Sequence, residues 1–223
     1  MQHKALLGEP IAQPINYCSA VADGHFTIEA KPVRTNPLTQ HWFLTMIQNE
    51  QVVITGTVVT AARRETWSGQ DATIPKANQP ATYPFSKRAA PMRWLDRYEI
   101  RPIVGGIPSE MDESENESLS QLWMKDSDQR AVHMQSLAAF CDLFFPRLLL
   151  RRSKMVPLGT ANMTSYFHTD SAQLKECATA NKYLLGQAKA QAYRNGFFDQ
   201  TAQVWSETGI LLASTHQLVY FKE

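Results

Sequence analysis

The stretch "DSDQRAVHMQSLAAFCDLFF", residues 126–145, is the best helix candidate in the chain and the starting point for predicting its fold. Ser127 or Asp128 can cap its start, and Pro146 is expected to end it near Phe145. Small residues keep one side of this helix thin enough for close packing against a sheet: Ala131, Ala138 and Ala139.

Strand patterns flank this helix on both sides. Before it, "RYEIRPI" (97–103) and "LSQLWMK" (119–125) predict two short strands. After it, four strands joined by tight turns are expected in "ANMTSYFHT" (161–169), "NKYLLGQAKAQAYRNG" (181–196), "FFDQTAQVWSE" (197–207) and "ILLASTHQLVYFK" (210–222). The order is therefore two strands, one helix and four strands.

The first third of the chain also predicts antiparallel strands. β-branched and aromatic runs alternate with Asp-Gly and Asn-containing turns from residue 15 to residue 67. Residues 68–92 carry four prolines and little apolar periodicity, which predicts a linker or an extended crossover. We therefore divide the chain into a first domain (1–67), a linker (68–92) and a second domain (93–223).

The two domains show a weak internal repeat. Residues 42–59 align without gaps with residues 200–217, and each copy has the pattern strand, polar turn, strand. This alignment places Val59 opposite Gln217. Since each copy predicts the same strand order, the chain is expected to hold two related α+β domains.

Composition narrows the function classes. Lys and Arg number 22 and Asp and Glu 21, so no bulk charge favours nucleic acid or an anionic membrane. No apolar run has the length of a membrane span, and three cysteines without C-x-x-C spacing indicate reduced thiols and a cytoplasmic protein. The six histidines show no metal-ligand spacing, so no metal is expected.

The order of elements resembles a hotdog domain, in which an antiparallel sheet wraps around one helix, and two copies resemble a double hotdog. The segments "LAAFCDLFF", "GTANMTSYFHT", "FFDQTAQVWSETG" and "ILLASTHQ" further resemble the acyl-CoA thioesterase II family. That resemblance implies hydrolysis of an acyl-CoA by an activated water, without a cofactor. It also implies that Asp142, Thr160 and Gln217 are the catalytic residues, and hotdog sheets imply a homo-oligomer.

The residues themselves can be weighed beside the resemblance. Asp142 lies among Phe and Leu residues near a helix end, where burial and the helix dipole disfavour a carboxylate; the alternative is an Asp on the solvent side of the helix. Thr160 alone is compatible with a turn residue, and Gln217 with a core amide bonded to backbone. Because Val59 replaces Gln217 in the first copy, we expect one active site, in the second domain.

These side chains suit thioester hydrolysis. Asp142 would accept or orient a proton of the water, while Gln217 and Thr160 would hold that water near attack distance. The oxyanion donor is expected to be a backbone N–H group. Cys141 has no adjacent histidine base in sequence, so we expect a small buried side chain rather than a nucleophile.

Two other functions stay open from the sequence. A non-catalytic acyl- or acyl-CoA-binding hotdog protein would use the polar trio only structurally. A hotdog enoyl-CoA hydratase would carry an Asp and a His five residues apart on the helix, but position 147 is Arg. A third group of residues, Arg151, Arg152 and Lys154, could contact coenzyme A phosphates or form a solvated basic loop.

The front of the first domain is short. "QHKALLGEP" (2–10) resembles the last turn of a helix ending at Gly8, and only sixteen residues precede Tyr17. We therefore expect the first hotdog to lack its opening strand and most of its helix.

Overall fold

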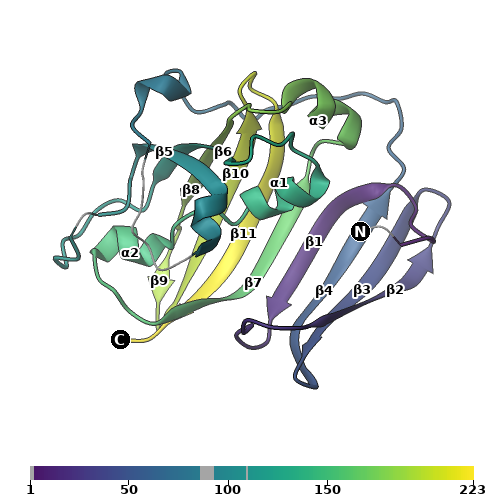
Figure 1. Ribbon diagram of the computed structural model, residues 1–223, viewed down its shortest axis with the longest axis horizontal. Helices are drawn as coiled ribbons and strands as arrows, with labels where there is room; N and C mark the ends of the chain where they lie inside the picture. Colours follow the sequence, from purple (N-terminus) through teal and green to yellow (C-terminus); the bar gives the residue numbers. More distant parts are fainter. Residues whose placement is uncertain (1–2, 86–92, 109) are drawn as a thin grey trace.

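The computed structural model describes residues 3–85, 93–108 and 110–223 (Figure 1). Within them, antiparallel strands form one 11-stranded sheet in the order β2-β3-β4-β1-β7-β11-β10-β8-β6-β5, with β9 paired to β10. The strands of the first half are β1 (Glu9–Tyr17), β2 (Thr27–Thr35), β3 (Thr39–Gln48) and β4 (Gln51–Ala61). Those of the second half are β5 (Tyr98–Val104), β6 (Ser120–Asp126), β7 (Leu158–Phe167), β8 (Leu184–Lys189), β9 (Tyr193–Arg194), β10 (Phe197–Ser206) and β11 (Leu211–Phe221).

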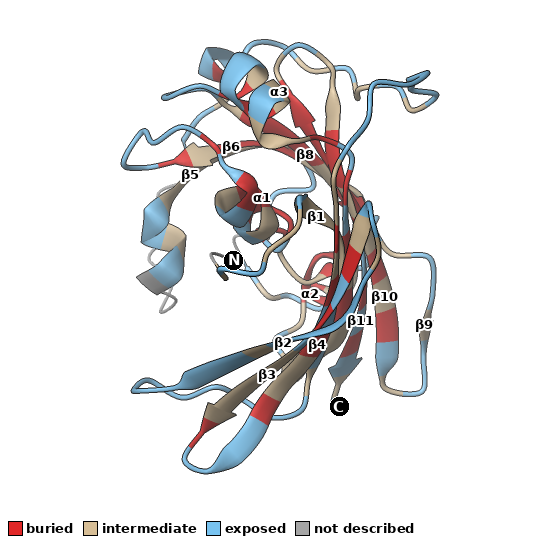
Figure 2. Ribbon diagram, turned by 90° about the vertical axis from the view of Figure 1, so that its right-hand side faces the viewer, coloured by how far each residue is buried: buried red, intermediate tan, exposed pale blue. Residues whose placement is uncertain are grey.

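All helices of the described residues come after β4 in the sequence. They are α1 (Met134–Phe140), α2 (Arg147–Arg152) and α3 (Ser171–Cys177), with 3₁₀ turns at η1 (Pro80–Thr82) and η2 (Arg93–Arg97). The second half of the sheet curls around α1, as Figure 2 shows. The main core lies between them and includes Met124, Leu137, Phe140, Leu184 and Leu212, each at most 1% exposed.

The central helix is shorter than its sequence predicts. The prediction that Ser127 or Asp128 caps it was wrong, because Asp126 accepts from the amide of Asp128 and binds Arg130, which folds these residues into a turn. The helix begins one residue after His133, whose side chain and Ser136 form a reciprocal capping box. It ends at Phe140, so the chain leaves it before reaching Pro146 and starts α2 there.

Two further elements differ from the prediction. The stretch 181–196 is not one strand, because the Asp199 carboxylate accepts from the amides of Gln191 and Ala192 and turns the chain between β8 and β9. The expected tight turn after β7 is instead the helix α3, capped by Asp170, which accepts from the amide of Gln173. An Asp three residues before a Gln and a buried Leu174 is the sequence signal for this helix.

The two predicted sheets are joined into one. Strand β1 pairs with β7 from Ala12 to Asn16, and this seam holds the halves edge to edge. The Asn162 side chain strengthens the seam by donating to the backbone oxygen of Ile15 at 3.0 Å and to Asn16 Oδ1 at 2.8 Å. The second half therefore leaves no free edge at β7.

The start of the described chain also departs from the prediction. Residues 3–7 form a turn rather than a helical end, and the amide of Leu6 donates to the oxygen of His3. Gly8 has a φ of +65°, and a Cβ there would lie 2.1 Å from the oxygen of Ala61, so only glycine fits before β1.

The segment between the halves lies along the second half. Gln70 donates to the oxygen of Gly209 and accepts from the amide of Leu211, and Trp123 Nε1 donates to the oxygen of Asn78. Residues 86–92, the end of the predicted linker, lie outside the described residues.

Candidate active site

Asp142 lies in the turn that follows α1. Its amide donates to the oxygen of Ala139, which holds the turn against the helix end. The side chain faces the sheet at β11, where Gln217 is 4% exposed in the middle of the strand. Helix end and strand thus bring together two residues that are 75 positions apart.

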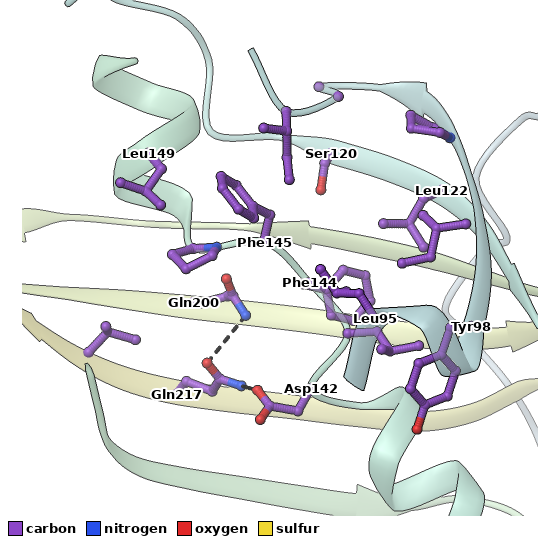
Figure 3. Close-up of a pocket in the computed structure, with 18 of the residues that line it drawn as sticks. Leu95, Tyr98, Ser120, Leu122, Asp142, Phe144, Phe145, Leu149, Gln200 and Gln217 are labelled. Atoms are coloured by element: carbon purple, nitrogen blue, oxygen red, sulfur yellow. Dashed lines mark hydrogen bonds between the residues drawn. The ribbon is translucent and has the colours of Figure 1, made fainter. Parts of the chain in front are cut away.

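The Gln217 amide is committed to three partners. Its nitrogen donates to Asp142 Oδ1 at 2.5 Å, and its oxygen accepts from Gln200 at 3.3 Å (Figure 3). The nitrogen also donates to the sulfur of Met163 at 3.1 Å. In the described part of the chain, Asp142 Oδ2 makes no hydrogen bond. One carboxylate oxygen is therefore held by the amide, while the other is open to a ligand or water.

Thr160 lies on β7, opposite Val219 of β11 and two positions along that strand from Gln217. It lines the same cavity as Asp142 and Gln217, so the structure brings all three predicted residues to one cavity. Among the described residues, Thr160 makes no direct hydrogen bond to either partner. A small molecule such as water would be needed to connect its hydroxyl to the pair.

The cavity has a volume of about 670 Å³. Apart from the polar cluster, its wall is largely aliphatic and aromatic, and Figure 3 shows Leu95, Tyr98, Leu122, Phe144, Phe145 and Leu149 around it. A cavity of this size and polarity is typical of a site for a ligand with an apolar body and one reactive polar end.

A second cavity of about 210 Å³ lies on the other side of Asp142. It forms where the halves meet, and β1 contributes Gln13, Ile15 and Tyr17 to its wall. Because Asp142 lines both cavities, its side chain keeps exposed surface although protein atoms surround it.

These surroundings shift the local acid–base equilibria. Burial raises the pKa of Asp142, and the hydrogen bond from Gln217 opposes that shift by favouring the carboxylate. Burial, with the nearby charge of Asp142, raises the pKa of Tyr17 to about 12. The pKa of Cys141 also rises to about 12, chiefly through burial, so this thiol is neutral and unsuited to nucleophilic attack.

Sequence reasoning missed two members of the polar cluster. Gln200 is 1% exposed and lies on β10 directly opposite Gln217. Arg147 is fully buried on α2, and its Nε donates to Oε1 of Gln200 at 3.0 Å. The sequence did carry a signal for Gln200. It lies on the same strand face as the buried apolar residues Phe198 and Ala202, just as Gln217 interrupts a mostly apolar face of its own strand. Arg147 offered no pattern, since a basic residue at a helix start is ordinarily a surface residue.

The repeat alignment is one residue out of register. Gln200 pairs with Gln217, whereas its aligned counterpart Trp42 pairs with Val58 rather than Val59. The difference arises because the β10–β11 turn is longer than the β3–β4 turn. The contrast survives, because Val58 is buried and apolar.

The predicted coenzyme A contacts lie outside the large cavity. Each is paired with a carboxylate: Arg151 with Glu115 at 3.1 Å, Arg152 with Glu223 at 2.6 Å and Lys154 with Glu113 at 3.6 Å. These pairs are at least partly exposed, so they are weak and exchangeable. Their role toward phosphates stays a prediction.

The histidines near the site are engaged elsewhere. His216 points to the opposite face from Gln217, as predicted, and pairs with Asp199 at 3.3 Å. His168 shares a hydrogen bond of 2.9 Å with Ser214. Among residues 3–85, 93–108 and 110–223, no three His, Cys, Asp or Glu side chains are grouped to hold a metal ion, and no helix is long and apolar enough to cross a membrane.

Comparison with known proteins identifies the family. The family model of the acyl-CoA thioesterase C-terminal domain matches residues 72–221 of the sequence, which is more than half of the chain. The chain therefore belongs to the acyl-CoA thioesterase family that this domain defines. No curated protein matches it.

Solved structures confirm the hotdog fold. A hotdog protein of unknown function from Alicyclobacillus acidocaldarius is 40% identical, with a TM-score of 0.92 over 100% of this chain and 82% of that one. An acyl-CoA thioesterase II from Mycobacterium marinum is 13% identical, with a TM-score of 0.75 over 96% of this chain and 80% of that one. At this low identity the second likeness shows the fold alone.

Proposed function

We propose that the protein hydrolyses the thioester of an acyl-CoA to a free carboxylic acid and coenzyme A. The observation that carries this proposal is the Asp142–Gln217 hydrogen bond at an apolar cavity, with Asp142 Oδ2 bonded by none of the described residues. The family supports the thioester as the substrate class.

The chemistry requires one water and one base. The water oxygen attacks the thioester carbonyl carbon, and Asp142 Oδ2 accepts a proton from it. Collapse of the tetrahedral intermediate breaks the carbon–sulfur bond, and the protonated Asp142 returns its proton to the leaving thiolate. Thr160 would hold the water from the β7 side, while Gln217 fixes the carboxylate by its bond to Oδ1.

The two cavities suit the two ends of this substrate. The apolar 670 Å³ cavity would take the acyl chain, and the smaller cavity at the seam between the halves would take the start of the pantetheine arm. The thioester would then lie beside Asp142, which lines both cavities.

A double-hotdog arrangement accounts for this geometry. In it, residues 1–67 and 93–223 are two repeats joined by residues 68–92, and only the second repeat carries the acid and the amide. The strand pairing across the β1–β7 seam supports this division. The exposed Ile28 and Val33 on the edge strand β2 favour assembly into a homo-oligomer, which light scattering after gel filtration would measure.

The decisive experiment is thiol release from acyl-CoAs of increasing chain length. The wild type should hydrolyse at least one substrate, and Asp142→Asn and Gln217→Ala should each lose most of that activity. Gln203→Ala on β10 is the matched control, because its side chain points to the opposite face from Gln200. Tight acyl-CoA binding without hydrolysis by the wild type would instead favour a binding protein.

A further inference from the structure

Arg147 is an unusual residue for the interior of this sheet. It is fully buried, and among the described residues it forms no ion pair with a carboxylate. Its guanidinium instead donates to Ser120 Oγ at 2.6 Å, to the oxygen of Ser118 at 3.0 Å, to the oxygen of Phe145 and to Gln200 Oε1 at 3.0 Å. Burial lowers its pKa to about 10, so it stays charged at neutral pH.

The bond to Gln200 begins a directed chain of hydrogen bonds. Arginine has only donors, so the Gln200 amide must turn its oxygen toward Arg147 and its NH₂ group toward Gln217. Gln217 must then accept at its oxygen, which leaves its NH₂ group for Asp142. The orientation of both amides follows from the guanidinium at the start of the chain.

We propose that Arg147 is a positioning residue: through Gln200 it fixes Gln217 as a hydrogen-bond donor to the Asp142 carboxylate. This inference rests on the proposed hydrolysis, because it assigns Asp142 the role of base. With the opposite amide orientation, Gln217 would place its oxygen against Asp142 Oδ1. Two acceptors would then repel each other unless Asp142 carried a proton, and a protonated Asp142 cannot accept one from water.

Two other titratable groups of the described residues interact with Asp142. Tyr17 of β1 and the adjacent Cys141 interact with it electrostatically, and both have a pKa of about 12, so both are neutral in the working range. Gln217 from β11 supplies the direct hydrogen bond to its carboxylate. The amide chain is therefore the part of the described surroundings that favours the ionised form.

A purely structural role for Arg147 makes a different prediction. Its bonds to Ser120, to Ser118 and to the oxygen of Ala188 at 3.3 Å tie α2 to β6 and β8, and loss of those bonds would unfold the site without informing on the chain of amides. A substitution at Gln200 tests the chain of amides directly, because Arg147 then keeps its hydrogen bonds to backbone oxygens.

The test is Gln200→Glu, compared with wild type and with the charge-matched control Gln203→Glu. The carboxylate that this substitution introduces gains an ion pair with Arg147, so the fold is retained, but its second oxygen is an acceptor and forces Gln217 to reverse. We expect kcat at neutral pH to fall roughly tenfold or more, as part of the roughly 10²–10⁴-fold worth of a general base. We also expect the acid limb of the kcat–pH profile to move to higher pH, with KM little changed.

Gln200→Met gives a second variant without added charge. It removes the constraint on Gln217, so we expect a smaller fall in kcat and a shift of the acid limb in the same direction. Wild-type kcat and an unmoved acid limb in Gln200→Glu, with melting temperature retained, would overturn the inference. That result leaves the proposed function intact if Asp142→Asn is still inactive, whereas a wild type that hydrolyses no acyl-CoA contradicts the proposed function itself.

Discussion

The amide nitrogen of Gln217 lies 2.5 Å from Oδ1 of Asp142, which joins the middle of β11 to the turn after α1. A shift of β11 by one residue would carry Gln217 to the other face of the sheet and break this bond. The register of the strand and the position of the helix end are therefore both needed for the site.

Asp142→Asn should separate activity from stability. The Asn side chain can still accept from Gln217 but cannot take a proton, so we expect kcat to fall by about 100-fold or more. Because burial disfavours the charged carboxylate, the neutral Asn should raise the melting temperature at pH 8. Thiol release and thermal unfolding check the two effects, and a variant with wild-type kcat would remove Asp142 from the mechanism.

The pH dependence follows from the raised pKa of Asp142. Activity needs the carboxylate, so the acid limb of kcat should lie above the ordinary Asp value of 3.8. The folded state also holds this proton more tightly than the unfolded state. The stability that the proton contributes is present below pH 3.8 and is lost as pH rises through the folded pKa. Urea unfolding of wild type and Asp142→Asn between pH 4 and pH 8 should show this difference; parallel curves would contradict it.

Thr160 should act through its hydroxyl. We expect Thr160→Val, which keeps the shape, to lower kcat by roughly tenfold, because one hydrogen bond to the water is lost. Thr160→Ser keeps the hydroxyl and should stay within about threefold of wild type. Equal activities of the Val and Ser variants would make Thr160 only a part of the cavity wall.

Leu149 should help set the length of the acyl chain. It lies on α2, is 5% exposed and lines the large cavity. Leu149→Trp would fill part of that volume, so we expect kcat/KM to fall for long acyl-CoAs and to stay near wild type for short ones. The ratio of the two substrates within one preparation corrects for misfolded protein. An unchanged ratio would place the acyl chain elsewhere.

The basic residues at the end of α2 and just after it can be tested through the phosphates of coenzyme A. The double variant Arg152→Gln, Lys154→Gln should raise KM for an acyl-CoA, because exposed ion pairs with Glu223 and Glu113 are weak enough to exchange for phosphate. The same acyl group on N-acetylcysteamine has no phosphates and should show an unchanged KM. Equal changes for both substrates would indicate a structural role.

The sequence predicted most of the strands well, apart from the break between β8 and β9, and predicted the central helix poorly, for a physical reason. A strand is recognised from the pattern of adjacent residues, as in "ILLASTHQLVYF", and the strand predicted there lies close to its predicted position. The start of α1 instead depends on whether Ser127 or Asp128 caps a helix there, or whether Asp126 binds the Asp128 amide and Arg130 in a turn, and both choices fit the same sequence. The pairing of β1 with β7 could not be predicted either, because its partners lie far apart in sequence, from Asn16 with Asn162 to Ala12 with Tyr166.

The site likewise contains residues that the sequence reveals and one residue that it does not. Gln217 was detectable because an amide interrupts an apolar row, and Gln200 carries the same signal on the next strand. Arg147 was not detectable, because its burial depends on carbonyl groups of β8 and of the segment before β6 that only the folded sheet brings around it. Sequence thus identifies polar residues inside strands, and the tertiary structure adds the charge that orients them.

The seam between the halves suggests a way to divide the molecule. The β1–β7 ladder and the bonds from Arg63 to the oxygens of Phe167 at 2.7 Å and Thr169 at 2.8 Å join the two halves through residues that lie outside the connecting chain. Two fragments, cut after Arg64, should therefore reassociate when mixed. Since Tyr17 of the first fragment walls the cavity beside Asp142 of the second, recovery of thiol release on mixing would report that complementation directly.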